Sequence, residues 1–151
     1  MKNQEEMIEL VADLATAKSQ QDVTAALEIY HPEIELIVPG SDSYAKGRAE
    51  VGIQLEMFFK MFPDYTAGVD QYAFNETVML ATGQVRLTPN IPGKECPLIQ
   101  LPVFFEFEFR DNKISKEVFV LDMGMVCKKT GILPVDMAGQ MKAIFAGLAQ
   151  Q

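Results

Sequence analysis

The segment KISKEVFVLD, residues 113–122, places acidic side chains among apolar ones, a pattern that can support proton transfer. Successive side chains of an extended segment alternate between two faces, so Glu117 shares a face with Ser115, Phe119 and Leu121. A carboxyl group in an apolar pocket has its pKa raised by desolvation, which suits a general acid or base near neutral pH. Glu117 is therefore the first candidate catalytic residue.

Each candidate for proton transfer has a simpler alternative. Glu117 can instead lie near the mouth of a pocket, solvated or paired with Arg86 or His31, because glutamate is rarely buried without a partner. His31 is the only histidine, and its ordinary pKa suits proton transfer. It falls between a predicted helix and a predicted strand, where an ordinary surface group is the alternative. Asp122 is the third candidate catalytic residue, and its alternative is a local hydrogen bond to the backbone.

Tyrosines offer one further kind of chemistry, whereas metal binding is disfavoured. A tyrosine hydroxyl could act as an oxyanion donor to a ligand carbonyl. The sequence does not choose among Tyr30, Tyr44, Tyr65 and Tyr72. The two cysteines, Cys96 and Cys127, lie outside any CxxC motif, and with one histidine they cannot supply the four ligands of a structural zinc site. We expect reduced thiols, no metal ion and no organic cofactor.

Hydrophobic spacing predicts the elements that must position these side chains. Apolar residues recur at helical spacing over 4–18, 23–30, 48–62 and 136–149, and Asp22 can cap the second of these helices. Period-two alternation predicts strands over 33–39, 66–75, 77–88, 98–110 and 113–126. The segment 41–47 is predicted to be a polar loop. Helices followed by consecutive hairpins indicate an α+β fold with an antiparallel sheet covered by helices on one face.

Length and charge narrow the class of protein. A chain of 151 residues with 48% hydrophobic residues is predicted to form a single domain, residues 1–151, with a substantial core. A formal charge of −8 argues against nucleic-acid binding and against an anionic membrane surface. The early acids of the N-terminus do not resemble a signal peptide, so we expect a cytoplasmic protein.

Three longer segments resemble the nuclear-transport-factor-two-like superfamily, and within it the SnoaL-like polyketide cyclases. They are LEIYHPEIELIVPG, KGRAEVGIQLEMFFKMFPDY and FEFEFRDNKISKEVFVLD, and their order and spacing extend the match over nearly the whole chain. The resemblance implies a cystatin-like cone: a strongly curved sheet against three to four helices, with an apolar interior. It also implies that Glu117 points into the cone. Several catalytic relatives carry an acid where this chain has Phe119, so Glu117 is a candidate displaced substitute.

Two functions are compatible with this pattern. The first is a cofactor-free isomerase, cyclase or hydrolase acting on a small apolar molecule that bears a carbonyl group. The second is a non-catalytic module that binds a hydrophobic ligand or forms a homodimer, with the row of Glu106 and Glu108 at the rim of the interface. Two or more titratable groups inside the cone favour the enzyme. The residues expected to line the cavity are aromatic: Phe58, Phe62, Tyr72, Phe105, Phe107 and Phe119.

Overall fold

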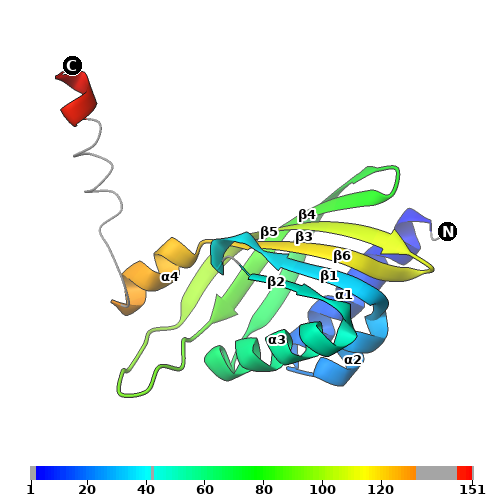
Figure 1. Ribbon diagram of the computed structural model, residues 1–151, viewed down its shortest axis with the longest axis horizontal. Helices are drawn as coiled ribbons and strands as arrows, with labels where there is room; N and C mark the ends of the chain where they lie inside the picture. Colours follow the sequence, from blue (N-terminus) through cyan, green and yellow to red (C-terminus); the bar gives the residue numbers. More distant parts are fainter. Residues whose placement is uncertain (1–2, 42, 132–145, 151) are drawn as a thin grey trace.

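The computed structural model of the chain describes residues 3–41, 43–131 and 146–150 and has an α+β architecture. Its helices are α1 (Gln4–Ser19), α2 (Val23–Ile29), α3 (Gly47–Met61) and α4 (Met123–Thr130). Its strands are β1 (Tyr30–Val38), β2 (Ser43–Lys46), β3 (Thr66–Asn75), β4 (Val78–Leu87), β5 (Ile99–Arg110) and β6 (Lys113–Leu121). They form one bent sheet in the order β2-β1-β6-β5-β4-β3, and α1, α2 and α3 lie against the same face of it (Figure 1). The predicted fold class is confirmed.

The N-terminal helices begin at caps that the sequence provides. Asn3 and Glu6 form a capping box at the start of α1, because each side chain accepts a hydrogen bond of 2.9 Å from the backbone N–H of the other. Asp22 caps α2 as predicted, with its Oδ1 atom 2.9 Å from the nitrogen of Ala25. The helices predicted over 4–18, 23–30 and 48–62 therefore match α1, α2 and α3 to within one residue at either end.

Strand pairing follows the predicted hairpins with one exception. β3, β4, β5 and β6 pair antiparallel in succession. β1 lies parallel to β6, with Leu36 opposite Glu117, so the sheet is mixed rather than antiparallel throughout. Hydrophobic alternation identifies a strand but not its neighbour. The long chain between β1 and β6 supplies the crossover that a parallel pair needs.

The segment 41–47, predicted to be a loop, contains the edge strand β2. This strand pairs antiparallel with β1, with Ala45 opposite Leu36. Ala45 is its one buried residue, at 5% exposure. An edge strand held by backbone hydrogen bonds, with one small side chain buried, carries almost no hydrophobic alternation, so the prediction was wrong here.

The last predicted strand, over 113–126, is too long. β6 ends at Leu121, and α4 begins directly after Asp122, whose Oδ1 atom accepts a hydrogen bond of 3.0 Å from the nitrogen of Met125. Gly131 ends α4 in the left-handed conformation, with φ of 67°. Most of the helix predicted over 136–149 lies outside the described residues, and 146–149 are helical. No described helix is both long enough and apolar enough to cross a bilayer.

The sheet bends where its register shifts. β3 contains a bulge between Val69 and Gln71, opposite Gly83 and Thr82 of β4, and bulges of this kind bend a strand and increase its twist. At Gly83 the two backbones come so close that a Cβ atom there would lie 1.9 Å from the carbonyl oxygen of Gly68. The bent sheet encloses the core on the side that the helices cover (Figure 1).

Candidate functional site

Glu117 lies inside the bent sheet, with 0% of its surface exposed. Lys18 Nζ donates a hydrogen bond of 2.6 Å to its Oε1 atom, and the hydroxyl of Tyr30 donates to its Oε2 atom. Both partners are buried as well, at 7% and 0% exposure. Three titratable groups from α1, β1 and β6 thus meet in the core. The alternative of a solvated Glu117, or of one paired with Arg86 or His31, is wrong.

The sequence patterns above do not single out Lys18, although its spacing carries a signal. Met7, Val11 and Leu14 are buried on one face of α1, and Lys18 continues that face at the next helical interval. A lysine in a buried stripe must either extend its amine to solvent or meet a buried acid. Searching the strands for an inward-facing acid would have paired it with Glu117.

Tyr30 is positioned by the junction at which α2 ends and β1 begins. Arg48, in the first turn of α3, donates two hydrogen bonds to the carbonyl oxygen of Tyr30, from Nε at 3.1 Å and from Nη2 at 2.5 Å. The side chain of Tyr30 points to the concave face, toward Glu117, and the next residue, His31, points to the opposite face. Of the four tyrosines, the fold therefore selects Tyr30 as the hydrogen-bond partner of the buried acid.

Burial sets the electrostatics of the site. Desolvation raises the pKa of Tyr30 well above its ordinary value, and the charge of Glu117 and the hydrogen bond to it add to the effect. The pKa of Tyr65, which is 1% exposed, is raised by the same desolvation and by the charge of Glu117. Both hydroxyls therefore remain protonated donors. Lys18 Nζ also lies 5.9 Å from the ring centre of Tyr30 and 5.7 Å from that of Phe119, within the range of cation–π attraction.

The raised pKa values of Tyr30 and Tyr65 predict that the protein loses stability in alkali. In the unfolded chain their phenols ionise near pH 10, whereas in the folded protein burial and Glu117 keep them protonated to higher pH. The contribution of the protonated phenols to the free energy of unfolding is complete below pH 10. Above pH 10 the free energy of unfolding falls by up to about 1.4 kcal/mol per pH unit for each tyrosine. Urea titrations from pH 9 to 11 should show Tyr65→Phe with a smaller slope than the wild type. Tyr44→Phe, which alters an exposed ring, is the control, and equal slopes for Tyr65→Phe and the wild type would contradict the prediction.

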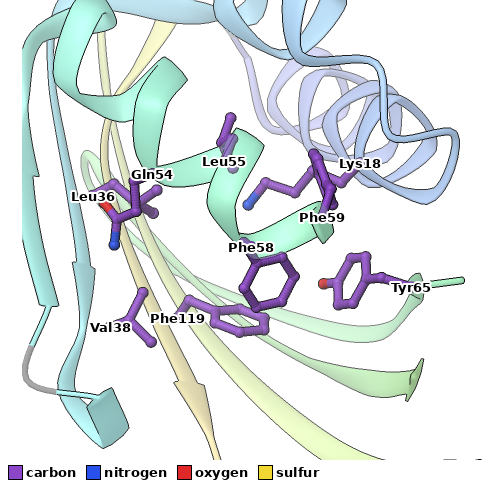
Figure 2. A pocket seen from close by; sticks show the side chains of 9 residues that line it. All are labelled: Lys18, Leu36, Val38, Gln54, Leu55, Phe58, Phe59, Tyr65 and Phe119. Carbon is purple, nitrogen blue, oxygen red and sulfur yellow. The ribbon is translucent and has the colours of Figure 1, made fainter. Parts of the chain in front are cut away.

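A mainly apolar cavity lies between α3 and the sheet, next to Lys18. Its volume is about 30 Å³, enough for roughly two water molecules. Figure 2 shows the amine of Lys18 and the hydroxyl of Tyr65 directed toward the middle of this cavity, where the ring of Phe58 lies. We call this space the front cavity, and its lining residues are Lys18, Leu36, Val38, Gln54, Leu55, Phe58, Phe59, Tyr65 and Phe119.

A smaller space, the rear cavity, lies on the other side of Lys18 and Tyr65. Its volume is about 10 Å³, and Glu117 forms part of its wall. Lys18 and Tyr65 belong to the lining of both cavities, so the two spaces meet at these polar side chains. The acid in the rear cavity and the apolar space in front of it therefore belong to one site.

The residues predicted to line a cavity are divided among several places. Phe58 and Phe119 line the front cavity, and Phe105 and Phe107 line the rear one. Phe62 is buried beside Phe58, with ring centres 4.9 Å apart, but lines neither space. Tyr72 lies in a surface groove between α1 and β3. Most of the aromatic side chains that fill the cone are packed core.

His31 is not the surface group expected between a helix and a strand, because β1 begins earlier than predicted and includes it. The ring is 8% exposed, and its Nε2 atom lies 3.1 Å from the carboxylate of Asp111. The other ring nitrogen, Nδ1, is 3.1 Å from the backbone N–H of Glu33 and 3.0 Å from Arg110 Nη2. With donors at Nδ1, the proton of the neutral ring is on Nε2. These partners tie β1 to the turn between β5 and β6, away from Glu117.

Asp122 is exposed and its carboxylate caps α4, which is the alternative that the sequence offered for it. Neither cavity includes it in its lining. Within the residues that the structure describes, no group of three His, Cys, Asp or Glu side chains is arranged to hold a metal ion. Among the three predicted catalytic residues, Glu117 alone is part of the buried site.

The bent sheet around helices, with a buried acid beside an apolar space, defines the class of cone-shaped NTF2-like and cystatin-like proteins. A protein from Jannaschia sp. CCS1 that is assigned as a SnoaL-like polyketide cyclase has a similar structure. The TM-score is 0.73 at 14% identity, over 89% of this chain and 99% of that one. TerC, co-crystallised with polyporic acid, has a TM-score of 0.71 at 14% identity, over 83% of this chain and 98% of that one. A cystatin-fold protein from Novosphingobium aromaticivorans has a TM-score of 0.62 at 19% identity, over 74% of this chain and 95% of that one.

The sequence itself assigns the family within this class. The SnoaL-like domain matches residues 11–117, more than half of the chain, and the protein therefore belongs to the SnoaL-like family. The match extends from the buried stripe of α1 to Glu117 in β6. It therefore includes all three residues of the buried triad, which we define as Lys18, Tyr30 and Glu117. Among curated protein sequences, none matches this chain significantly. The likeness to the solved structures, at these low identities, concerns the fold.

Proposed function

We propose that this protein is a cofactor-free acid–base enzyme that acts on a small, mainly apolar molecule bearing a carbonyl group. Proteins of the SnoaL-like family bind small molecules, and the front cavity offers an apolar space beside titratable groups. The observation that carries the proposal is the buried triad of Lys18, Tyr30 and Glu117, in which Lys18 lines both cavities and Glu117 lines the rear one. A single isolated acid would instead have favoured a passive binding protein.

The triad suggests a division of roles for proton transfer beside a carbonyl. Glu117 takes a proton from the carbon next to the ligand carbonyl. The electron pair of the broken C–H bond forms a C=C bond to the carbonyl carbon, and the π pair of the carbonyl moves to its oxygen. Lys18 and Tyr65 face both cavities and can donate hydrogen bonds to the resulting enolate oxygen. Return of the proton to the same or another carbon completes an exchange or an isomerisation. Tyr30 holds the carboxylate of Glu117 in place.

The front cavity must widen to admit a ring. An apolar cavity of about 150 Å³ accommodates benzene, so the space between α3 and the sheet is too small as it stands. Val38, Gln54 and Phe58 are its half-buried lining residues, whereas Leu36 and Leu55 are buried. We therefore expect a ligand to enter by displacing Phe58 and Val38 from the outer wall.

Hydrogen–deuterium exchange tests the proposal without knowledge of the natural substrate. Acetophenone and other small aryl ketones are incubated with the protein in D₂O, and deuterium at the carbon next to the carbonyl is followed by NMR. We expect exchange above the buffer rate, and a decrease of about 10²–10⁴-fold in Glu117→Gln. The matched control is Glu108→Gln, which changes a half-buried acid that pairs with Lys116 on the opposite face of the sheet. No exchange with any ketone, or an unchanged rate in Glu117→Gln, would refute the proposal.

We also propose a homodimer formed by the convex face of the sheet. Phe104, Leu80 and Val120 are exposed there at 54%, 52% and 42%, and Phe104 lies directly opposite Val120. Lys116 pairs with the acids of the predicted rim, Glu106 and Glu108, at 3.5 and 3.2 Å. An apolar centre beside charged groups is typical of an interface.

Sedimentation velocity tests the dimer. Phe104→Glu places a charge at the centre of the proposed contact and should shift the protein from dimer to monomer. Ile53→Glu is the control, because Ile53 is 60% exposed on α3, which covers the other side of the sheet. A monomeric wild type, or a dimer that dissociates in Ile53→Glu and persists in Phe104→Glu, would exclude this interface.

A further inference from the structure

The amine of Lys18 is buried beside an open space. The side chain is 9% exposed, and Figure 2 shows its amine directed toward the middle of the front cavity. Among the described residues, its one hydrogen-bond acceptor is Glu117 Oε1, at 2.6 Å. An ammonium group carries three N–H donors, so two of them remain for the space in front of it. The amine is therefore open to a molecule in the cavity rather than to bulk solvent.

Glu117 is placed to convert this ammonium group into a nucleophile. Transfer of one proton from Nζ to Oε1, across the 2.6 Å contact, leaves a neutral amine and a carboxylic acid. Burial opposes charged groups, and this transfer removes both charges at once, so a ligand that displaces water from the cavity favours it. A lysine that is desolvated in an apolar pocket forms Schiff bases with carbonyl compounds. Lys18 thus has its proton acceptor beside it.

We propose that Lys18 captures short, unhindered aldehydes as a covalent imine. The neutral amine attacks the carbonyl carbon and forms a C–N bond, while the π pair of the carbonyl moves to its oxygen, which takes the proton held by Glu117. Glu117 then passes a second proton from the nitrogen to this hydroxyl group. The nitrogen pair forms the C=N bond, and the C–O bond breaks to release one water molecule. The product is a positive iminium group beside the carboxylate, so the buried ion pair is restored.

The shape of the front cavity favours a short aldehyde. The cavity holds about two water molecules, so a chain of a few carbons requires less widening than a ring. Leu36, Leu55 and Phe119 supply apolar walls for that chain. The hydroxyl of Tyr65, directed into the same space, can donate a hydrogen bond to the oxygen that develops charge. The inference goes beyond the proposed function, in which Lys18 donates a hydrogen bond and forms no covalent bond.

Reductive trapping tests the inference. The wild-type chain is incubated at pH 7 with propanal and sodium cyanoborohydride, which reduces an imine to a stable propylamine, and peptide mass spectrometry follows each lysine with time. We expect Lys18 to be propylated at least about 10-fold faster than Lys116, because a positioned acid–base group accelerates the reaction. Lys116 is the matched control: it pairs with Glu106 and Glu108, but its side chain is 29% exposed. Its hydrogen bond to Glu108 raises its pKa, so its amine stays protonated at pH 7.

An NMR measurement without the reductant detects the imine itself. Propanal labelled with ¹³C at the carbonyl carbon should give an imine signal with the wild-type protein. The signal should be absent from Lys18→Met combined with Glu117→Gln, which removes the nucleophile and leaves no unpaired charge in the core.

The outcomes distinguish the inference from the proposed function. Labelling of Lys18 no faster than that of Lys116, no imine signal in the wild type, or a signal that persists in the double variant would overturn the inference. Trapping at Lys18, together with no deuterium exchange of aryl ketones, would support the covalent site and refute the proposed function. Exchange that depends on Glu117, with Lys18 left unlabelled, would do the reverse.

Discussion

Replacing Lys18 with methionine is expected to lower the free energy of unfolding by about 3–5 kcal/mol, because it leaves the buried carboxylate of Glu117 without its counter-charge. Lys18 Nζ lies 2.6 Å from Glu117 Oε1, and the two side chains are 9% and 1% exposed. Methionine preserves the apolar stem of the lysine, so the lost charge is the main change. Equilibrium unfolding in urea at pH 7 measures the effect.

A second variant distinguishes the loss of the charge pair from poor packing. Lys18→Met combined with Glu117→Gln removes both charges, keeps an acceptor for the hydroxyl of Tyr30, and should recover at least half of the lost stability. Lys116→Met is the matched control: its ion pairs with Glu106 and Glu108 are partly exposed, and its loss should change stability by less than about 1 kcal/mol. If the double variant is as unstable as Lys18→Met, packing rather than charge explains the result.

Gly83→Ala is expected to destabilise the protein by about 3 kcal/mol or more, at the upper end of the range for overpacking. The new Cβ atom would lie 1.9 Å from the carbonyl oxygen of Gly68, and a backbone atom cannot move aside as the end of a flexible side chain can. To relieve the clash, β3 and β4 must separate beside the bulge between Val69 and Gln71. Unfolding in urea, together with far-UV circular dichroism, measures the loss.

Gly68→Ala is the control for this change, because it removes the glycine on the other side of the same contact. A Cβ atom at position 68 meets nothing within 4 Å, so this variant should remain within about 1 kcal/mol of the wild type. Similar effects of the two substitutions would show that general strand propensity, rather than the close approach at Gly83, determines the outcome.

Local patterns were sufficient for the elements with strong periodicity. The stripe of Met7, Val11 and Leu14 predicted α1, and the alternation of Phe105 and Phe107 with acids predicted β5 and its buried face. The edge strand β2 was missed because a short polar strand buries too little to leave a pattern. The start of α4 was missed for a different reason, because its first residues were assigned to the preceding strand. Asp122 illustrates the second error: an acid after an apolar strand can equally end the strand and cap a helix.

The sequence by itself determined that an acid would lie among apolar residues on one face of the last strand, and its motifs pointed to the SnoaL-like family. Only the tertiary structure decided which groups meet Glu117. Lys18 is 99 residues and Tyr30 is 87 residues away along the chain, and they reach it through the packing of α1 on the sheet and the parallel pairing of β1 with β6. Periodicity records which side of an element is buried. The partner across the core depends on long-range packing, which no local pattern encodes.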